Sequence, residues 1–433
     1  MPLKEMYSDA FPIGILGLGY VGLPLAILSA QKGFQVFGID HNKERIREIE
    51  RGNSRLVDVN DDDLSILLQN NNLSLSSSCE DLARCRAVFI CVSTSLTNKG
   101  EPDHSHLLSA VEKTATYVKP GTLIIIESTC APGTTQEIIL PLIQAKEFHV
   151  GENLFLAYSP ERIDPGNKFY SLGNIPKLVS GITPSCRLAA LDLYEKLNIP
   201  TVAVKNTTVA ELAKVLENTY RDVNIALVNE LAKICPKYGI DVWEVVRAAA
   251  SKPFGFQPFY PGPGVGGSCI PKDSSYLIHW AQKNNTPALL VETARRTNEN
   301  MPEYTLGQVE RFLKEKNLRL EGSKVMVLGT TYKKDVGDLR GSPALELIKL
   351  LISRNVIVSY HDPFIEKLEM DSLTLPGKEL TNEVLKLQDC VVLAVSHSYY
   401  KISRLTSAAD KILDLTGTLP RNIINGGKEG EHE

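Results

Sequence analysis

The sequence predicts an α/β fold in which two Rossmann-like, doubly wound domains are joined by a central all-helical domain with one long helix. Three observations lead to this prediction. Short apolar runs alternate with helical patterns in the amino-terminal half of the 433-residue chain, a stretch without strand signals follows, and the alternation returns near the carboxyl end. Alternating strands and helices are typical of a parallel sheet covered by helices on both faces.

The amino-terminal part opens with a strand-like run at residues 13–16, a helical segment rich in small residues, and a second strand-like run at 34–39. Runs of the same kind recur, separated by helical patterns such as 105–117 and 187–196, at residues 87–92, 123–127, 154–158 and 177–180. We therefore expect a first Rossmann-like domain over residues 1–204.

Residues 207–237 contain no strand signal and no proline before Pro236. Apolar and small residues recur there at helical spacing, which predicts one long helix, and another helical pattern covers 275–296. We expect a central helical domain over residues 205–305. Strand and helix patterns then alternate again, which predicts a second Rossmann-like domain over residues 306–433.

The composition argues against several classes of protein. The formal net charge of −4 gives no strongly basic surface of the kind that nucleic acid binds. None of the eight cysteines forms a Cys-x-x-Cys pair, which argues against zinc ribbons and thioredoxin chemistry. The polar start of the chain, and the lack of an apolar run near the ~20 residues of a membrane span, lead us to expect a cytoplasmic protein with reduced thiols.

His104 and His106 lie two residues apart beside Asp103 and could indicate a metal ligand pair. Histidines with this spacing on a loop are more often solvated, and no third ligand is evident in the sequence. We therefore expect no metal site.

A glycine motif follows the first strand-like run and opens the first helical segment. Gly17, Gly19 and Gly22 are spaced as in a dinucleotide-binding turn, and Asp40 ends the second strand-like run 18 residues after Gly22. An acid there accepts hydrogen bonds from a ribose, which favours NAD over NADP. The alternative is a structural tight turn. Arg45 is near enough in sequence to contact adenosine or phosphate, and is equally well explained as a solvated helix residue.

The most unusual segment is a loop of glycine and proline at residues 261–273, which carries Cys269, Lys272 and Asp273. Such a segment keeps its backbone close to another group. A neighbouring cation favours the thiolate form of cysteine, which is the nucleophile. We therefore interpret Cys269 as functional and the other seven cysteines as small buried residues.

The predicted long helix has a polar face. Lys214 and Asn218 are four residues apart and share it, and Arg221 and Asp222 continue it. A lysine and an asparagine one turn apart can stabilise an oxyanion. A solvated stripe explains the same pattern equally well.

Together these segments make the chain resemble the UDP-glucose/GDP-mannose dehydrogenase family along nearly its whole length. The matching motifs, in the family's order, are residues 17–25, 127–134, 159–162, 211–230, 266–273 and 332–340. The resemblance implies an NAD domain, a central helical dimerisation domain and a UDP-sugar-binding domain. It also implies oxidation of a sugar C6 hydroxyl to a carboxylate with two NAD⁺, for polysaccharide biosynthesis, by a homodimer that contacts neither nucleic acid nor membrane.

The resemblance further implies catalytic roles. Cys269 attacks the aldehyde to form a thiohemiacetal that is oxidised to a thioester, while Lys214 and Asp273 help to remove the hydroxyl proton. Glu161 acts as general base for thioester hydrolysis, and Asn218 and Lys214 stabilise the oxyanion. The water is held by Thr129.

Ligand-binding residues are implied in the same way. Those expected at the cofactor are Gly17, Gly19, Tyr20, Val21, Gly22, Asp40, Arg45, Ser93, Thr94 and Thr129. Those expected at the substrate are Glu161, Arg162, Lys214, Asn218, Tyr260, Gly266, Lys333 and Arg340.

The sugar is predicted from two segments, residues 159–167 and 252–264, which resemble the N-acetylhexosamine branch of the family. Ser268 and Lys272 instead match UDP-glucose enzymes. We expect UDP-N-acetylglucosamine, with UDP-glucose, UDP-ManNAc and UDP-GalNAc as alternatives. A one-step β-hydroxyacid-type dehydrogenase fits less well, because that class lacks a cysteine nucleophile and a second α/β domain.

Overall fold

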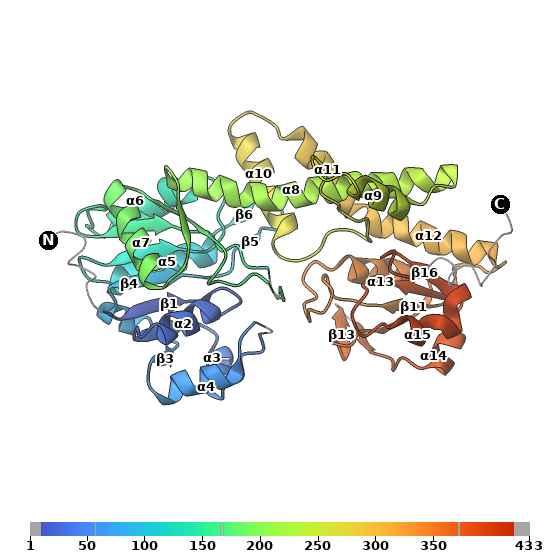
Figure 1. The fold of residues 1–433 in the computed structure, drawn as a ribbon, viewed down its shortest axis with the longest axis horizontal. Coiled ribbons are helices and arrows are strands. Elements are labelled where there is room, and N and C mark those ends of the chain that lie inside the picture. The colour runs from blue at the N-terminus through green and yellow to red at the C-terminus, as the bar shows by residue number, and fades with distance from the viewer. Residues whose placement is uncertain (1–9, 57, 165, 168, 371–372, 420–433) are drawn as a thin grey trace. The chain divides into compact units, whose positions relative to one another are not determined.

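The computed structural model describes residues 10–419 except 57, 165, 168, 371 and 372, so the outermost parts of both expected α/β domains, 1–9 and 420–433, lie outside it. The chain divides into two compact units. The first consists of residues 1–217 and 275–287, and the second of 218–274 and 288–433. Each unit contains its own sheet and its own core (Figure 1).

The first unit is built on an eight-stranded sheet with the order β10-β9-β8-β7-β4-β1-β2-β3. Its strands are β1 (Ile13–Leu16), β2 (Val36–Ile39), β3 (Leu73–Ser76), β4 (Ala87–Ile90), β7 (Leu123–Ile126), β8 (Phe155–Tyr158), β9 (Lys177–Gly181) and β10 (Thr201–Ala203). β1 pairs in parallel with both β2 and β4, so the strand order reverses beside it. Ligands of open α/β sheets bind at the carboxyl ends of strands at such a point.

The prediction of a parallel sheet is wrong for one pair of strands, because β9 runs antiparallel to β8. The described residues of the 158–177 connection, which are all but 165 and 168, form no helix, so the chain turns back along the sheet edge without the crossover that a parallel pair needs. The first residue of β9, Lys177, therefore lies at the edge of the sheet where β7 and β8 end.

Helices cover both faces of this sheet because alternate strand residues point to opposite sides. Ile13 and Ile15 belong to a buried cluster with α2 and α7, whereas Leu16 belongs to a second cluster with α5 and α6. The helices of this part, followed by its short hairpin strands, are α2 (Gly22–Gln31), α3 (Lys43–Glu50), α4 (Asp61–Gln69), α5 (Ser105–Tyr117), α6 (Leu140–Gln144), α7 (Pro184–Lys196), β5 (Ser95–Leu96) and β6 (Pro102–Asp103).

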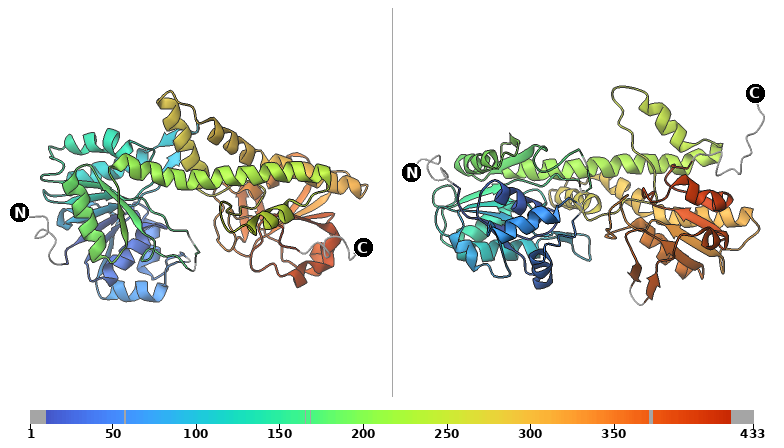
Figure 2. Two further views of the ribbon diagram at one scale, coloured as in Figure 1. Left: turned by 45° about the horizontal axis from the view of Figure 1, so that its top comes forward. Right: turned by 60° about the horizontal axis from the view of Figure 1, so that its bottom comes forward.

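The predicted long helix is present as α8 (Thr207–Ile234), which runs unbroken for 28 residues (Figure 2). It ends in a 3₁₀ turn at Cys235–Tyr238, where Gly239 adopts a φ of 68° that closes the carboxyl end. The helices that follow are α9 (Val242–Ala250), α10 (Ile270–Lys283), α11 (Leu289–Glu299) and α12 (Met301–Glu315).

The helical pattern at 275–296 corresponds to two helices, α10 and α11, with Pro287 in the break between them. α10 also begins earlier than the pattern predicts, directly after Cys269. Pro271 lies in its first turn, where the missing N–H of proline removes no helical hydrogen bond.

The second unit contains a parallel four-stranded sheet with the order β12-β11-β15-β16. Its remaining elements are β11 (Lys324–Leu328), α13 (Pro343–Ser353), β12 (Ile357–His361), β13 (Lys367–Met370), β14 (Leu373–Pro376), α14 (Asn382–Lys386), β15 (Cys390–Leu393), α15 (Ile402–Leu405) and β16 (Ile412–Asp414). α12 and α13 pack on one face, and α14 and α15 contribute to the core on the other. The α/β, helical and α/β parts follow each other as predicted.

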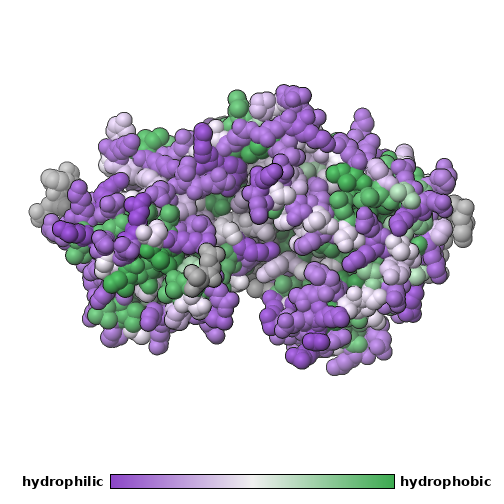
Figure 3. Space-filling view, turned by 180° about the vertical axis from the view of Figure 1, so that it is seen from behind, coloured by the Kyte–Doolittle hydropathy of each residue, from purple (hydrophilic) through white to green (hydrophobic). Residues whose placement is uncertain are grey.

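The visible surface in Figure 3 is mostly hydrophilic, with separate hydrophobic patches. Within the described part of the chain, no helix combines the length and the apolar character that crossing a membrane requires.

Candidate active site and dinucleotide site

The glycine turn after β1 is required by its backbone packing. A Cβ on Gly17 would lie 2.6 Å from the carbonyl oxygen of Cys91, and one on Gly22 would lie 1.8 Å from that of Gly17. Gly17 also has a φ of 89°, which favours glycine. By contrast, nothing lies within 4 Å of a Cβ on Gly19, so open space remains in front of α2. The amino-terminal end of α2 begins beside this space, and such a helix end favours an anion such as a pyrophosphate.

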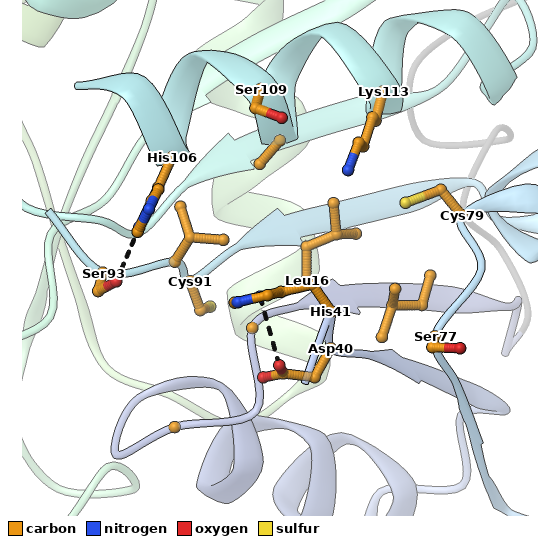
Figure 4. A pocket seen from close by; sticks show the side chains of 15 residues that line it. Leu16, Asp40, His41, Ser77, Cys79, Cys91, Ser93, His106, Ser109 and Lys113 are labelled. Atoms are coloured by element: carbon orange, nitrogen blue, oxygen red, sulfur yellow. Dashed lines mark hydrogen bonds and ion pairs between the residues drawn. The ribbon is translucent and has the colours of Figure 1, made fainter. Parts of the chain in front are cut away.

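Beside this turn is a cavity of about 380 Å³ (Figure 4). It is lined by Leu16, Gly17, Gly19, Ile39, Asp40, His41, Ser77, Cys79, Cys91, Val92, Ser93, His106, Ser109, Ala110 and Lys113. Asp40 is oriented by the turn itself, because its carboxylate accepts hydrogen bonds of 2.9 Å from the backbone N–H groups of Leu18 and Asn42. The cavity combines a mainly apolar wall with an acid at the end of β2, which fits an adenosine ribose.

Other predicted cofactor residues surround this site in different ways. Tyr20 is at the exposed turn, Val21 precedes the first residue of α2, and Thr94 donates a hydrogen bond of 2.8 Å to the carbonyl oxygen of Thr129. Arg45 lies behind the turn and does not line the cavity. Its guanidinium donates hydrogen bonds to the carbonyl oxygen of Leu18, at 3.2 Å, and to that of Ser54, at 2.7 Å. The bond to Leu18 stabilises the glycine turn.

Glu161, the predicted general base, lies just beyond the end of β8, and its side chain is 10% exposed. One carboxylate oxygen accepts the backbone N–H groups of Arg162, at 2.6 Å, and Ile163, at 2.8 Å. The other accepts from the ammonium of Lys177 at 2.9 Å. Burial opposes ionisation, but the Lys177 ammonium and these donors lower the pKa of Glu161 below its usual value.

Lys177 is a residue that the sequence analysis missed as part of the site. It is 1% exposed and also contacts Glu127 at 2.5 Å, and Glu127 in turn accepts a hydrogen bond from the hydroxyl of Tyr194. Burial raises the pKa of Glu127 to about 7. The available signal was a lysine at the start of an otherwise apolar strand, because a charged residue in such a strand requires a buried partner.

The remaining contacts of this loop explain how it meets α8. Arg162 forms an ion pair of 2.7 Å with Glu217 on α8 and donates to the carbonyl oxygen of Pro176, also at 2.7 Å. Glu217 lies between Lys214 and Asn218 along the helix. The position of the Glu161 loop is thereby coupled to the helix that carries the predicted oxyanion residues.

In the second unit, Asn218 and Asp273 are brought together although 55 positions separate them. The amide of Asn218 donates to the Asp273 carboxylate at 2.6 Å, and the ammonium of Lys272 contacts the same carboxylate at 2.6 Å. Arg221 donates to the amide oxygen of Asn218. Both Asn218 and Asp273 are 1% exposed, so this part of the polar face of α8 is a buried network and not a solvated stripe.

Cys269 directly precedes α10, one turn before Asp273, whose backbone N–H donates to the Cys269 carbonyl oxygen at 2.9 Å. Among the eight cysteines, all within the described residues, it is the exposed one. Six are buried, and Cys79 is half-buried.

The glycine loop before Cys269 packs against the segment that follows β11. A Cβ on Gly266 would lie 2.7 Å from the carbonyl oxygen of Gly341, and the Gly267 N–H donates to the Arg340 carbonyl oxygen at 2.9 Å. The structure thus joins the predicted substrate residues Gly266 and Arg340. Lys333 is half-buried in the same segment.

Two further predicted substrate residues, Arg340 and Tyr260, also belong to the second unit. The guanidinium of Arg340 pairs with Asp338 at 2.5 Å, which orients it. Tyr260 is 48% exposed and stacks on Trp243 with a centroid distance of 5.7 Å.

A buried polar cluster that the sequence analysis did not identify holds the 330–340 segment. Asp362, directly after β12, accepts the Thr330 N–H at 2.6 Å, and His397 accepts the Asp335 N–H at 2.9 Å. Asp362 repeats the role of Asp40, since each follows the second strand of its sheet and accepts a backbone N–H from the turn after the first. The sequence signal was a glycine after β11 and an aspartate after β12.

The predicted catalytic residues therefore fall into two sets. Thr129, Glu161 and Lys214 belong to the first unit, and Asn218, Cys269 and Asp273 to the second. Lys214 and Asn218 are one turn apart on the continuous α8. Within the residues that the structure describes, no group of three or more His, Cys, Asp or Glu side chains is arranged to hold a metal ion.

The comparisons with known proteins identify one family along the chain. Its models match as the "NAD binding domain" at residues 11–198, the "central domain" at 208–300 and the "UDP binding domain" at 326–421. The chain therefore belongs to the UDP-glucose/GDP-mannose dehydrogenase family. It is an NAD-dependent UDP-sugar dehydrogenase, which confirms the predicted family, enzyme class and cofactor.

Individual relatives differ in the sugar named. UDP-N-acetyl-D-glucosamine 6-dehydrogenase of Pseudomonas aeruginosa is 34% identical, covering 93% of this chain and 96% of its own. UDP-N-acetyl-D-mannosamine dehydrogenase of Methanococcus maripaludis is 33% identical, covering 96% and 92%. The solved structure of UDP-D-ManNAc dehydrogenase from Pyrococcus horikoshii has a TM-score of 0.86 and 31% identity, covering 94% and 96%.

Proposed function

We propose that this protein oxidises the C6 hydroxyl of UDP-N-acetylglucosamine to the carboxylate, a four-electron reaction with two NAD⁺. The observation that carries the reaction type is the exposed Cys269 at the start of α10, one turn from the buried Asn218–Asp273 network. An exposed thiol can trap an aldehyde covalently.

We assign a separate role to each of the three expected domains. Residues 1–204 bind NAD, 205–305 carry the helices of the dimer and the cysteine loop, and 306–433 bind the UDP-sugar. The residues proposed at the reacting carbon are Thr129, Glu161, Lys214, Asn218, Cys269 and Asp273. Of the described residues, none forms a hydrogen bond or ion pair with the Lys214 ammonium, which is therefore available to a substrate oxygen.

In the first oxidation, the C6 hydroxyl loses its proton to the solvent with the help of Lys214 and Asp273, one C6 hydrogen leaves with two electrons as hydride, and C6 becomes an aldehyde. Bound NAD⁺ supplies the two-electron acceptor for each of the two oxidations. The Cys269 thiolate then attacks the aldehyde carbon, forming a C–S bond, and the oxygen takes up a proton. Loss of that proton from oxygen, and of the C6 hydrogen with two electrons as hydride, turns this thiohemiacetal into a thioester.

Hydrolysis completes the reaction. Glu161 takes a proton from a water molecule held at Thr129 while the water oxygen bonds to the thioester carbon. Lys214 and Asn218 stabilise the resulting oxyanion, and the C–S bond breaks to release the carboxylate and the Cys269 thiolate. The covalent bond keeps the aldehyde from diffusing away between the two oxidations.

The choice of N-acetylglucosamine is supported by the motifs at residues 159–167 and 252–264 and by the name of the Pseudomonas relative. A second candidate is UDP-N-acetylmannosamine, favoured by the names of the Methanococcus relative and of the similar Pyrococcus structure. The two sugars differ only in configuration at C2, so a direct comparison of substrates separates them.

We propose a homodimer formed through α8. Tyr220, Leu227 and Ile234 are exposed and recur every seven residues, which places them on one stripe of the helix, and Leu216 extends it. We further propose that the enzyme works in the cytoplasm, where its cysteine thiols remain reduced, and supplies an acidic sugar nucleotide for polysaccharide biosynthesis.

The test is the yield of NADH per sugar. The purified protein is incubated with NAD⁺ and, separately, the UDP forms of N-acetylglucosamine, N-acetylmannosamine, N-acetylgalactosamine and glucose. We expect two NADH per sugar, with the highest kcat/KM for UDP-N-acetylglucosamine. One NADH per sugar contradicts the four-electron reaction, and a higher kcat/KM for another sugar contradicts the substrate assignment.

A pair of cysteine variants tests the covalent mechanism. Cys269→Ser is expected to lower complete turnover by about 100-fold or more, because an alkoxide forms far less readily than a thiolate at neutral pH. Cys235→Ser, which changes a buried cysteine elsewhere, serves as the control. Normal acid product from Cys269→Ser contradicts the mechanism.

A further inference from the structure

Three charged side chains form a buried cluster at one edge of the large sheet. Glu127 follows β7, Glu161 lies beyond β8, and Lys177 begins β9. The antiparallel register pairs Tyr158 with Ser180, and continuing it by three residues places Glu161 opposite Lys177. The reversed direction of β9 thus brings a lysine to the edge where two parallel strands deliver carboxylates.

The three side chains of this cluster differ in their exposure to solvent. The side chains of Glu127 and Lys177 are 0% and 1% exposed, whereas that of Glu161 is 10% exposed. The Lys177 ammonium reaches both carboxylates, at 2.5 and 2.9 Å, and Tyr194 of α7 donates to the free oxygen of Glu127. Among the three, Glu161 is the one that a substrate can reach.

A purely structural role explains this arrangement poorly. When both carboxylates are ionised, they leave an excess negative charge beside the one ammonium in the interior, and buried ion pairs are often no more stable than apolar side chains of the same volume. Tyr194 and Cys91 also face the cluster. Burial raises the pKa of each well above its usual value, so both remain neutral and add no compensating charge.

We propose that Lys177 is a positioning residue for hydrolysis of the thioester, holding Glu161 as an oriented carboxylate while Glu127 and Tyr194 hold Lys177. This inference rests on the proposed function, in which Glu161 takes a proton from water. The two backbone N–H groups fix one oxygen of Glu161 and Lys177 fixes the other, so the carboxylate keeps one orientation within the first unit.

The consequence is a defined pH dependence. Without the ammonium, burial is the largest remaining influence on Glu161 and raises its pKa. Glu161 then becomes protonated, and inactive as a base, at a higher pH. The acid limb of the hydrolysis rate moves upward, while the two preceding oxidations, which do not use Glu161 as a base, are unaffected.

The test uses Lys177→Met and pre-steady-state kinetics with the full-length enzyme, the best UDP-sugar and NAD⁺. We expect a burst of two NADH per site, as in the wild type, followed by a steady-state rate that is lowered by about tenfold on the acid limb of the pH profile, which corresponds to an upward shift of that limb by about one pH unit. Mass spectrometry of the intact protein should show thioester on Cys269 accumulating in the variant.

Three other variants keep the test decisive. Lys177→Arg, which retains the charge, should restore most of the wild-type acid limb. The double variant Lys177→Met/Glu127→Gln also removes the Glu127 carboxylate, which Lys177→Met would leave buried without its ammonium partner. It is therefore expected to fold even if Lys177→Met alone misfolds, and its acid limb should show the same upward shift. Arg295→Met breaks a buried ion pair with Asp222 at 2.9 Å in the second unit, and its acid limb should match the wild type.

The outcomes separate this inference from the proposed function. An unshifted acid limb in folded Lys177→Met or in the double variant overturns the role of Lys177. A wild type that yields no two-NADH burst overturns the proposed function instead. A Glu161→Gln variant that hydrolyses the thioester at the wild-type rate overturns the role of Glu161 on which both depend.

Discussion

At the residue scale, the glycines of the first turn do different work although they belong to one motif. Gly17 and Gly22 pack against backbone atoms at distances that no Cβ tolerates, whereas Gly19 faces open space. The motif alone does not distinguish the glycines that the fold needs from the one that leaves room for a ligand.

The variants Gly22→Ala and Gly19→Ala separate these roles. Gly22→Ala should reduce the free energy of unfolding by about 3 kcal/mol, because the new methyl group meets the Gly17 carbonyl oxygen. Gly19→Ala should leave stability within about 0.5 kcal/mol and weaken NAD binding, because its methyl group enters the space in front of α2. Urea unfolding and titration with NAD⁺ measure the two effects. Equal stability losses contradict this assignment.

Glu127 provides a second prediction at this scale. Its pKa is about 7 in the folded protein, above its ordinary value. The folded state therefore binds the proton more tightly, so the contribution to stability is complete at low pH and is lost as the pH rises through about 7. This slope is at most about 1.4 kcal/mol per pH unit.

Glu127→Gln should flatten that dependence. Urea unfolding at about pH 5, 6 and 7 gives the free energy of unfolding for wild type and variant, and the wild type should lose stability relative to the variant as the pH rises. The pH dependence of stability that Glu161 contributes has the opposite sign. Because the pKa of Glu161 is lowered in the folded protein, its contribution to the free energy of unfolding is lost as the pH falls. Parallel curves for the two proteins contradict the protonation of Glu127.

At the element scale, α8 combines three tasks along one helix. Glu211 near its start accepts the backbone N–H groups of Gly133 and Thr135, at 2.6 and 2.8 Å, which fixes the helix to the loop after β7. Lys214 and Asn218 follow within the next two turns. Asp222 then pairs with Arg295 of α11, and the exposed apolar stripe runs along the helix from Leu216 to Ile234.

The apolar stripe leads to a prediction about assembly. Leu227→Lys should convert a dimer to a monomer, because it places a charge in the proposed interface, which excludes unpaired charges. The matched control is Leu188→Lys on α7, since Leu188 is 54% and Leu227 57% exposed. Sedimentation velocity measures both. A Leu227→Lys variant that stays dimeric rules out α8 as the interface.

At the scale of the whole molecule, the two sheets share the same glycine turn and aspartate arrangement. In each, a glycine with positive φ follows the first strand, Gly17 and Gly329, and an aspartate after the second strand, Asp40 and Asp362, accepts a backbone N–H from the turn. In both sheets the strand order also reverses beside the first strand. The family assigns NAD to one of these sites and UDP to the other.

This assignment predicts separate responses to ligands. At about 100 times its dissociation constant, a ligand stabilises the unit that binds it by about 2.7 kcal/mol. NAD⁺ should therefore protect backbone amides of β1, β2 and α2 from hydrogen exchange, and UDP those of β11, β12 and α13. Mass spectrometry of peptides measures the protection. NAD⁺ that protects only the second set contradicts the assignment.

Much of the fold and part of the site could be predicted from local patterns. The strand and helix alternation, the unbroken α8 and the glycine turn depend on residues close in sequence, so periodicity and spacing are enough to identify them. The antiparallel β9 could not be predicted, because strand direction depends on the path of the 158–177 connection. The start of α10 was placed late because the pattern began after Pro271, which a first helical turn accommodates.

The sequence by itself determined the family, the cofactor and the order of the α/β and helical parts, and it predicted Cys269 as the functional one of eight thiols, because these depend on motifs and their spacing. Only the tertiary structure decided that Arg45 supports the glycine turn, that Asn218 contacts Asp273, and that Lys177 lies between two buried carboxylates. The reason is physical: hydrogen bonds and ion pairs between residues far apart in the chain exist only once strands and helices have packed, and burial then determines which charges persist.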